Sequence, residues 1–186
     1  MFERLRTWVS TKSRGDKQAR TSTGLIPYRG QSTSELLALV PTHRTDMVVT
    51  AFVDGLFAKQ NTVGLEHLSS AERVVLAVEA IERDINSDGF DGLFRWSADL
   101  APHFISSLSA IGREDVAEIV SSAIDALKIN GEMTAAAVGA AMSWESRARD
   151  SELEVLDQRY YALDVDMAPD VLRWIEANRS NVLAGA

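Results

Sequence analysis

Residues 69–96 read SSAERVVLAVEAIERDINSDGFDGLFRW, and this stretch indicates the kind of fold that the chain adopts. Ser69 and Glu72 have the S-x-x-E spacing of a capping box, a pair of reciprocal side-chain to backbone hydrogen bonds at a helix start. Apolar residues then follow at helical intervals, at Val74, Val78, Ile81 and Ile85. Residues 86–89 predict a turn, and residues 90–96 predict a second, short helix. The stretch therefore predicts a helix, a turn and another helix.

The rest of the chain has the same helical spacing, and no segment alternates polar and apolar residues for long. Pro41, Gly112 and Gly131 stand where helices end, and Pro102 and Pro169 stand where helices begin. Helices are predicted over residues 35–40, 45–59, 69–85, 90–96, 102–111, 113–129, 133–149 and 151–163, and from residue 166 onward. We therefore expect an all-α fold, a single globular domain of about seven to nine helices.

Charge divides the chain into two parts, a basic N-terminal arm over residues 1–34 and an acidic helical domain over residues 35–186. Residues 1–20 hold six Lys and Arg against two acidic residues, so the remainder holds 13 basic and 25 acidic residues. The arm, which glycine and proline interrupt, is predicted to be partly irregular; it is either a solvated tail or a segment that binds an anionic surface. An acidic body repels phosphate backbones and attracts basic partners. We therefore expect no direct nucleic-acid binding by the body.

Composition also indicates the cellular compartment in which the protein is expected. The chain has no cysteine, which excludes disulfides and thiolate metal sites and is typical of a reducing cytoplasm. No apolar run approaches the roughly 18 residues of a membrane helix. Arg4 and Arg6 have no apolar segment behind them, as a signal peptide would require. A cytoplasmic location without membrane contact is the prediction.

No motif for catalysis, cofactor binding or metal binding is found. Residues 84–89 (DINSDG) copy the start of a calcium-binding EF-hand loop, but Asp91 replaces the apolar eighth residue and Arg95 the bidentate glutamate at position twelve. The histidines, His43, His67 and His103, have no second ligand at helical spacing. We therefore expect no cofactor, no metal and no enzymatic activity.

The turn and the aromatic residues after it have a structural interpretation. Gly89 supplies a positive φ angle there, and Asn86 or Asp88 caps neighbouring backbone. Phe90, Phe94 and Trp96 are interpreted as anchors in the hydrophobic core, with a ligand pocket as the alternative.

One acidic arrangement is a candidate interaction surface. Glu114, Glu118 and Asp125 lie within about 40° of one another on the predicted helix, opposite its apolar face. Together with Asp88 and Asp91, they could present carboxylates to a basic partner, although a solvated helix face has the same pattern. The three charges on the helix span about 16 Å, over which duplex DNA carries on the order of ten. Imitation of DNA would therefore need acidic side chains from several helices or from two subunits.

The motifs around the turn resemble those of the DNA-mimic protein family, small acidic helical bacterial proteins that are mostly uncharacterised. The resemblance is carried by residues 68–73 (LSSAER), 82–94 (ERDINSDGFDGLF) and 110–112 (AIG), and by Leu156 with Asp157, Tyr160 with Tyr161, and Asp164 near the end. It is good over about residues 68–128, weaker to about residue 183, and does not cover residues 1–44. The resemblance implies an all-α fold, often a homodimer, and in some members the presentation of carboxylates to DNA-binding proteins.

Three functions are therefore considered. The first is a non-enzymatic acidic interaction module that competes with DNA for a basic protein such as a repressor or nucleoid protein. The second is an interaction or immunity-type module that uses an apolar groove, closed in one version by the N-terminal arm. The third is an uncharacterised enzyme, for which the sequence offers no substrate.

Overall fold

The computed structural model describes residues 25–183 of the 186-residue chain, and within them it contains eight α-helices, two short 3-10 helices and no strand. This confirms the all-α fold and the expected number of helices. The α-helices are α2 (Thr33–Leu37), α3 (Thr45–Val63), α4 (Ser70–Trp96), α5 (Phe104–Ala110), α6 (Glu114–Ala126), α7 (Ala135–Met142), α8 (Arg147–Ala162) and α9 (Ala168–Ala177). The 3-10 helices are η1 (Leu65–His67) and η2 (Ala101–His103).

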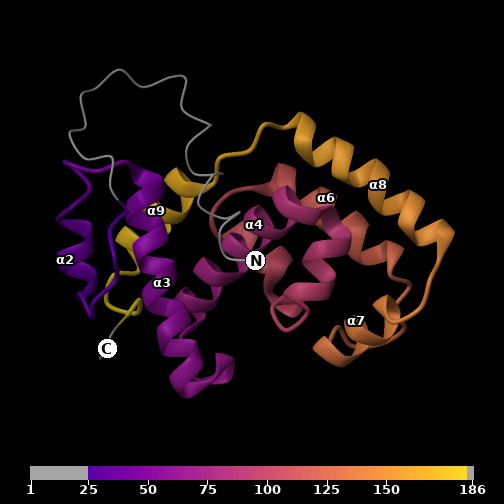
Figure 1. Ribbon diagram of the computed structural model, residues 1–186, viewed down its shortest axis with the longest axis horizontal. Helices are drawn as coiled ribbons and strands as arrows, with labels where there is room; N and C mark the ends of the chain where they lie inside the picture. Colours follow the sequence, from indigo (N-terminus) through magenta and orange to yellow (C-terminus); the bar gives the residue numbers. More distant parts are fainter. Residues whose placement is uncertain (1–24, 184–186) are drawn as a thin grey trace.

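Helix α4 is the central element of the fold. It contacts α3 and α9 on one side and α5, α7 and α8 on the other, and α6 packs on α5 and α8 (Figure 1). Its apolar face, including Leu76, Ile81 and Ile85, is fully buried, and so are Phe52 of α3 and Phe104 of α5. One continuous hydrophobic core therefore surrounds α4. Among the described residues, no helix is both long enough and apolar enough to cross a membrane.

The start of α4 is fixed by the capping box that the sequence predicts. Ser69 Oγ accepts a hydrogen bond from the Glu72 amide, and Glu72 Oε2 accepts one from the Ser69 amide at 2.9 Å. Glu72 is fully buried, where its Oε1 pairs with Lys59 Nζ at 2.9 Å and accepts a hydrogen bond from the Leu183 amide at 2.8 Å. A residue recognised as a local cap therefore also ties α4 to α3 and to the last described residue.

The predicted turn after residue 85 is a two-residue break inside α4. Only Asp88 and Gly89 leave the helical region, and Gly89 adopts the expected positive φ, +68°. The Phe90 amide, which begins the second half of α4, donates to Asp157 Oδ1 of α8 at 2.8 Å. Tyr161 of α8 donates its hydroxyl proton to the Ile85 carbonyl at 2.7 Å. The break is therefore capped from α8, and a Cβ at position 89 would collide with the Asp157 carboxylate.

One prediction about this region needs correction, and the choice between Asn86 and Asp88 as the capping residue is decided. Phe90 and Phe94 are fully buried as expected, but Trp96 is 64% exposed and is not a core anchor, because it ends α4 at the surface. Asn86, half-buried, donates to the Glu82 carbonyl within its own helix, and the side chain of Asp88 accepts a hydrogen bond from Ser87. Asn86 therefore caps a neighbouring backbone carbonyl, as predicted, whereas the Asp88 side chain forms no hydrogen bond with a backbone group of the described residues.

Several helix boundaries also differ from the prediction. α3 continues to Val63, where Gly64 with a φ of +88° ends it. The helix expected over residues 133–149 stops at Met142, and α8 starts early at Arg147, because Ser146 accepts a hydrogen bond from the Arg149 amide. The predicted arm extends over residues 1–34, but residues 1–24 lie outside the described residues.

Candidate functional site

Helix α6 has two faces of opposite character. Val116, Val120 and Ala123 are fully buried, while the acidic residues of the predicted stripe, Glu114, Glu118 and Asp125, are exposed. Glu114 accepts a hydrogen bond from Ser109 Oγ at 3.0 Å. None of the three forms an ion pair with a residue in the described part of the chain. Their charges are therefore available to solvent or to a partner.

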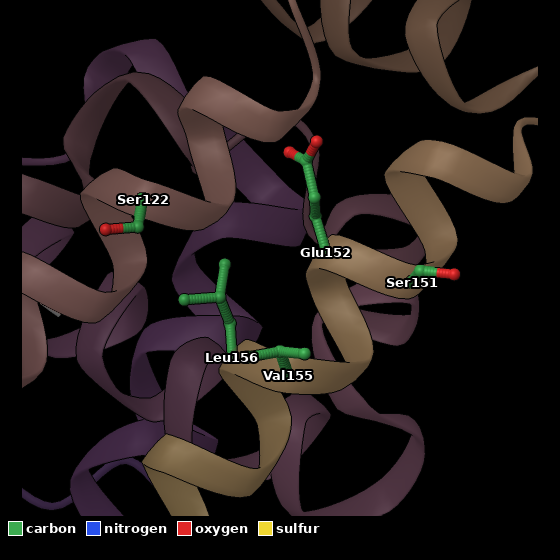
Figure 2. Close-up of a pocket in the computed structure, with 5 residues that line it drawn as sticks. All are labelled: Ser122, Ser151, Glu152, Val155 and Leu156. Atoms are coloured by element: carbon green, nitrogen blue, oxygen red, sulfur yellow. The ribbon is translucent and has the colours of Figure 1, made fainter.

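Beside this stripe, α6 and α8 enclose a shallow groove of ≈ 390 Å³, lined by Ser122 of α6 and by Ser151, Glu152, Val155 and Leu156 of α8. Figure 2 shows Ser122 and Leu156 on either side of the space between the two helices. Val155 is 62% exposed, although it is a large apolar residue. The surface that lines the groove is therefore largely apolar and open to solvent.

Two carboxylates lie at or near the groove, and one of them is close to a lysine. Glu118 lies one turn before Ser122 on α6, and its backbone carbonyl accepts a hydrogen bond from Ser122 Oγ at 3.0 Å. On the α8 side, Glu152 Oε2 lies 3.7 Å from Lys128 Nζ, both groups being largely exposed. We define the acidic face as Glu114, Glu118 and Asp125 of α6 together with Glu152 and Val155 of α8. Carboxylates beside apolar surface suit lysine or arginine, whose aliphatic stems cover apolar atoms while the charged ends reach oxygen.

Asp88 and Asp91, which the sequence grouped with this surface, belong to a different place. Both lie at the break in α4, beside Asp157, which projects from α8 about 160° away from Val155. Asp91 is half-buried and pairs with Arg95, Nε to Oδ2 at 2.6 Å. The predicted surface is therefore divided by α8 into the acidic face and this second cluster.

The second cluster has a structural role. Burial raises the pKa of Asp157, the Phe90 amide lowers it, and the charges of Asp91 and Glu154 raise it again. Burial, followed by the charges of Asp157 and Asp88, likewise raises the pKa of Tyr161. These carboxylates share one small region, in which Asp157 is committed to the α4 break. Within residues 25–183 no group of three or more His, Asp or Glu side chains is arranged to hold a metal ion.

Charge is concentrated around the acidic face. Residues 111–166, which contain α6, α7 and α8, hold twelve acidic and five basic residues, a net charge of −7. Residues 25–83 are similar in length, yet they hold seven acidic and five basic residues, a net charge of −2. The segment of sequence that contains α6 and α8 is therefore the more acidic of the two.

Sequence reasoning found the acidic stripe but missed the groove beside it. Leu153, Leu156 and Tyr160 form the buried stripe of α8, whereas Val155 lies off that stripe. The available signal in the sequence was Val155 itself, an apolar residue on the polar side of an otherwise amphipathic helix, which indicates a possible contact surface. That α6 lies across the groove from Leu156 could not be inferred from spacing, because Ser122 is far from Leu156 in the sequence.

Comparison with known proteins supplies a family. A family model described as DMP19-like protein matches residues 66–178, which include the capping box, the α4 break and the whole acidic face. That description does not state DNA mimicry, so the assignment to the DNA-mimic protein family, made from the motifs, is corrected to the family that matches. No curated protein and no solved structure matches the chain.

Proposed function

The chain belongs to the DMP19-like protein family, and we propose that it acts without catalysis, as an interaction module whose acidic face binds a basic, partly apolar segment of another protein. The observation that carries this proposal is the exposure of Glu114, Glu118 and Asp125 in one row, without ion pairs to described residues, beside an apolar groove. A partner with lysine or arginine on one side of a helix or strand would satisfy both features.

The charge pattern explains why a partner would prefer this face. Elsewhere, several carboxylates are already neutralised at short range, as Asp115 is by Arg113 and Asp150 is by Arg149. The row on α6 keeps its charge and places it where the net charge of the surrounding sequence is also negative. Attraction between such exposed charges is screened by salt, with a Debye length of about 10 Å at 0.1 M ionic strength. Binding should therefore be steeply salt-dependent.

The finer part of the proposal concerns the kind of partner. A basic DNA-binding protein, such as a repressor or a nucleoid protein, would have its DNA-contacting residues engaged by the acidic face, so that DNA and this protein would compete. The acidic row presents three carboxylates over about 16 Å, whereas duplex DNA presents on the order of ten phosphates over the same length. A homodimer that places two acidic faces side by side would reduce this difference, and we include it in the proposal.

The test uses a synthetic amphipathic peptide of alternating lysine and leucine blocks as a probe for the face. Its affinity is measured by fluorescence anisotropy between low and high salt for the wild type and for the triple variant Glu114→Lys, Glu118→Lys, Asp125→Lys. We expect the triple variant to bind at least about tenfold more weakly and to have a shallower salt dependence. The matched control reverses three exposed acids elsewhere, Glu66, Asp99 and Glu176, and should bind more tightly than the triple variant although its net charge is the same.

Equal affinities of the two triple variants would mean that only net charge matters and would refute a defined acidic face. For the finer proposal, immobilised wild type and triple variant are exposed to a bacterial lysate at low salt and then washed with duplex DNA. DNA-binding proteins should be retained by the wild type alone and released by the DNA. Retention of such proteins by both variants, or no release, would remove competition with DNA.

A second candidate function is favoured by one observation, the exposure of Val155, which lines the groove. In this version apolar contact dominates, and the acidic residues only surround it. Val155→Ser would then abolish peptide binding, the charge reversals would have little effect, and binding would persist at high salt. The same titrations therefore separate the two functions.

A further inference from the structure

The first nine residues of the chain combine the two properties that the acidic face is proposed to recognise. Residues 1–9 read MFERLRTWV, with two arginines and four large apolar side chains, Phe2, Leu5, Trp8 and Val9. Phe2, Leu5 and Trp8 recur every three residues, a spacing typical of side chains on one side of a helix. Solvated tails are poor in aromatic residues, so this composition indicates a segment that binds a surface. We call residues 1–9 the docking segment.

The charge of the N-terminal arm is complementary to that of α6. Residues 1–20 hold six of the 19 Lys and Arg residues, and the other thirteen are distributed over 166 residues. Between Glu114 and Ala126, α6 has four acidic residues and no basic one, the largest acidic excess of any described helix. Opposite charges draw a tethered segment towards a surface. Charge therefore favours contact of the arm with α6.

The groove beside α6 supplies the apolar part of the surface. Val155, which lines it, is 62% exposed, and Leu156 lies across the groove from Ser122 (Figure 2). Its volume of ≈ 390 Å³ lies in the range of about 300–1,000 Å³ that is typical of pockets for drug-sized molecules. The groove therefore has room for a large side chain such as that of Trp8.

The arm is long enough to reach this groove. Tyr28 packs on Gly55 of α3, so the described chain begins on the other side of the molecule from α8 (Figure 1). Residues 10–24 connect the docking segment to it and contain one apolar side chain, Ala19. Fifteen extended residues span about 50 Å. A domain of this size has a radius of gyration of about 15 Å and a width of roughly 40 Å. The docking segment can therefore reach the acidic face of its own chain.

We propose that the docking segment occupies the groove of its own chain, with Trp8 against Val155. Arg4 and Arg6 then lie against the carboxylates of the acidic face. The segment excludes the basic partner, so the arm regulates this face by competition; the inference rests on the proposed function. A tethered segment has an effective concentration in the millimolar range. With an intrinsic Kd of about 0.1 mM it fills the face roughly nine-tenths of the time and weakens partner binding about tenfold.

The first experiment titrates the full chain with the lysine–leucine peptide at low salt. The arm variant Arg4→Gln, Arg6→Gln, Trp8→Ser removes both charges and the largest apolar side chain of the docking segment. It should bind the peptide about fivefold to tenfold more tightly than the wild type. The control, Arg29→Gln with Arg179→Gln, has the same net charge and changes exposed arginines outside the segment, so its gain should stay below about twofold. No gain in the arm variant, or equal gains in both, would overturn the proposal.

The second experiment locates Trp8 by NMR. Because the chain has no cysteine, Ser151→Cys provides a single attachment site for a nitroxide label on an exposed residue that lines the groove. The label should broaden the Trp8 indole N–H signal, which Trp8→Phe identifies among those of the four tryptophans. The same label at Glu176→Cys, exposed on α9 beside α3, should broaden that signal less. Equal broadening by the two labels, or the reverse order, would overturn the proposal.

The same label tests which chain the segment contacts. In the Ser151→Cys protein, the triple reversal of Glu114, Glu118 and Asp125 should abolish the broadening of the Trp8 signal, because the new lysines repel Arg4 and Arg6. Broadening that falls on dilution would place the segment on a second copy and overturn the contact within one chain.

Failure of this inference and failure of the proposed function give different results. If the triple variant loses affinity for the peptide while the arm variant gains none, the docking segment is not on the face and the proposed function stands. Equal affinities of the two triple variants would instead refute the proposed function, whatever the arm variant shows.

Discussion

Helices α4 and α6 both carry several acidic residues, but α4 buries some of its carboxylates, whereas a row of carboxylates on α6 is exposed to solvent. Glu72 and Asp84 of α4 are buried, whereas Glu114, Glu118 and Asp125 of α6 are exposed. The buried pair is fully engaged: Glu72 contacts Lys59 and two backbone amides, and Asp84 accepts hydrogen bonds from Arg83 and Ser97. The exposed row has no ion pair among the described residues.

This difference shows that the role of a carboxylate is decided by its surroundings. A buried carboxylate must be paired and hydrogen-bonded, because an isolated charge in the interior is very unfavourable. An exposed one interacts strongly with water and contributes little to stability. Glu72 and Asp84 should therefore be needed for folding, and Glu114, Glu118 and Asp125 should be needed for binding.

The largest effect is expected at Glu72. Glu72→Ala removes the ion pair to Lys59 and leaves the amides of Leu183 and Ser69 without this acceptor. We expect a loss of about 3–5 kcal/mol in the free energy of unfolding, measured by urea denaturation. The control, Glu66→Ala, removes an exposed carboxylate from the preceding turn and should cost less than about 0.5 kcal/mol. Similar losses in the two variants would contradict the separation between buried and exposed acids.

The next effect concerns the break in α4, which α6 lacks. Gly89→Ala would place a Cβ against the Asp157 carboxylate and force a side chain into a backbone region that is essentially restricted to glycine. We expect destabilisation of about 1–3 kcal/mol. Gly139→Ala in α7, where nothing lies within 4 Å of the added Cβ, should instead stabilise the protein by roughly 0.5–1 kcal/mol. A stable Gly89→Ala protein would show that the α8 contact does not restrict this position.

Glu79 of α4 allows the effect of burial on a carboxyl group to be tested through the pH dependence of stability. Burial raises its pKa to about 7; Arg83 acts in the opposite direction, and Asp84 and Asp54 add to the rise. In the unfolded chain the carboxyl is deprotonated above about pH 4.5. Between pH 4.5 and 7 the folded protein therefore holds a proton that the unfolded chain has lost, so this group lowers the free energy of unfolding as the pH rises through that window.

Glu79→Gln removes this dependence. The stability of the variant relative to the wild type should be greater at pH 8 than at pH 5, by on the order of 1 kcal/mol, measured by denaturation at both pH values. Burial also raises the pKa of Asp54, which is more exposed, so Asp54→Asn should change in the same direction by a smaller amount. A difference that is independent of pH would mean that Glu79 is ionised in the folded protein as it is in water.

The smallest effect on stability is expected on α6. The triple reversal of Glu114, Glu118 and Asp125 should change the free energy of unfolding by less than about 0.5 kcal/mol per residue, because none of the three is buried. Thermal denaturation of the variant used in the binding experiment provides the measurement. A large loss of stability would show that these carboxylates support the fold and would also undermine their use as a binding surface.

Much of the fold could be predicted from the sequence, because its signals are local. The capping box at Ser69, the positive φ of Gly89 and the exposure of the α6 stripe depend on residues within a few positions of each other. The cap of the break could not be predicted, because Asp157 lies 67 residues after Phe90. Trp96 was misassigned because helical spacing alone does not show which face of a short helix reaches the surface.

The candidate site divides in the same way. The acidic stripe follows from periodicity on one helix, but the groove depends on how α8 packs against α6.

The sequence by itself determined that this chain is all-helical and acidic, where helix α4 begins, and which carboxylates of α6 face solvent. These properties depend on backbone capping and on 3.6-residue periodicity, which act over a few residues. Only the tertiary structure decided which carboxylates are buried and paired in the core, and which surface lies beside the acidic row. Those properties depend on distances between residues remote in the chain, and only the packing of the helices brings such residues together.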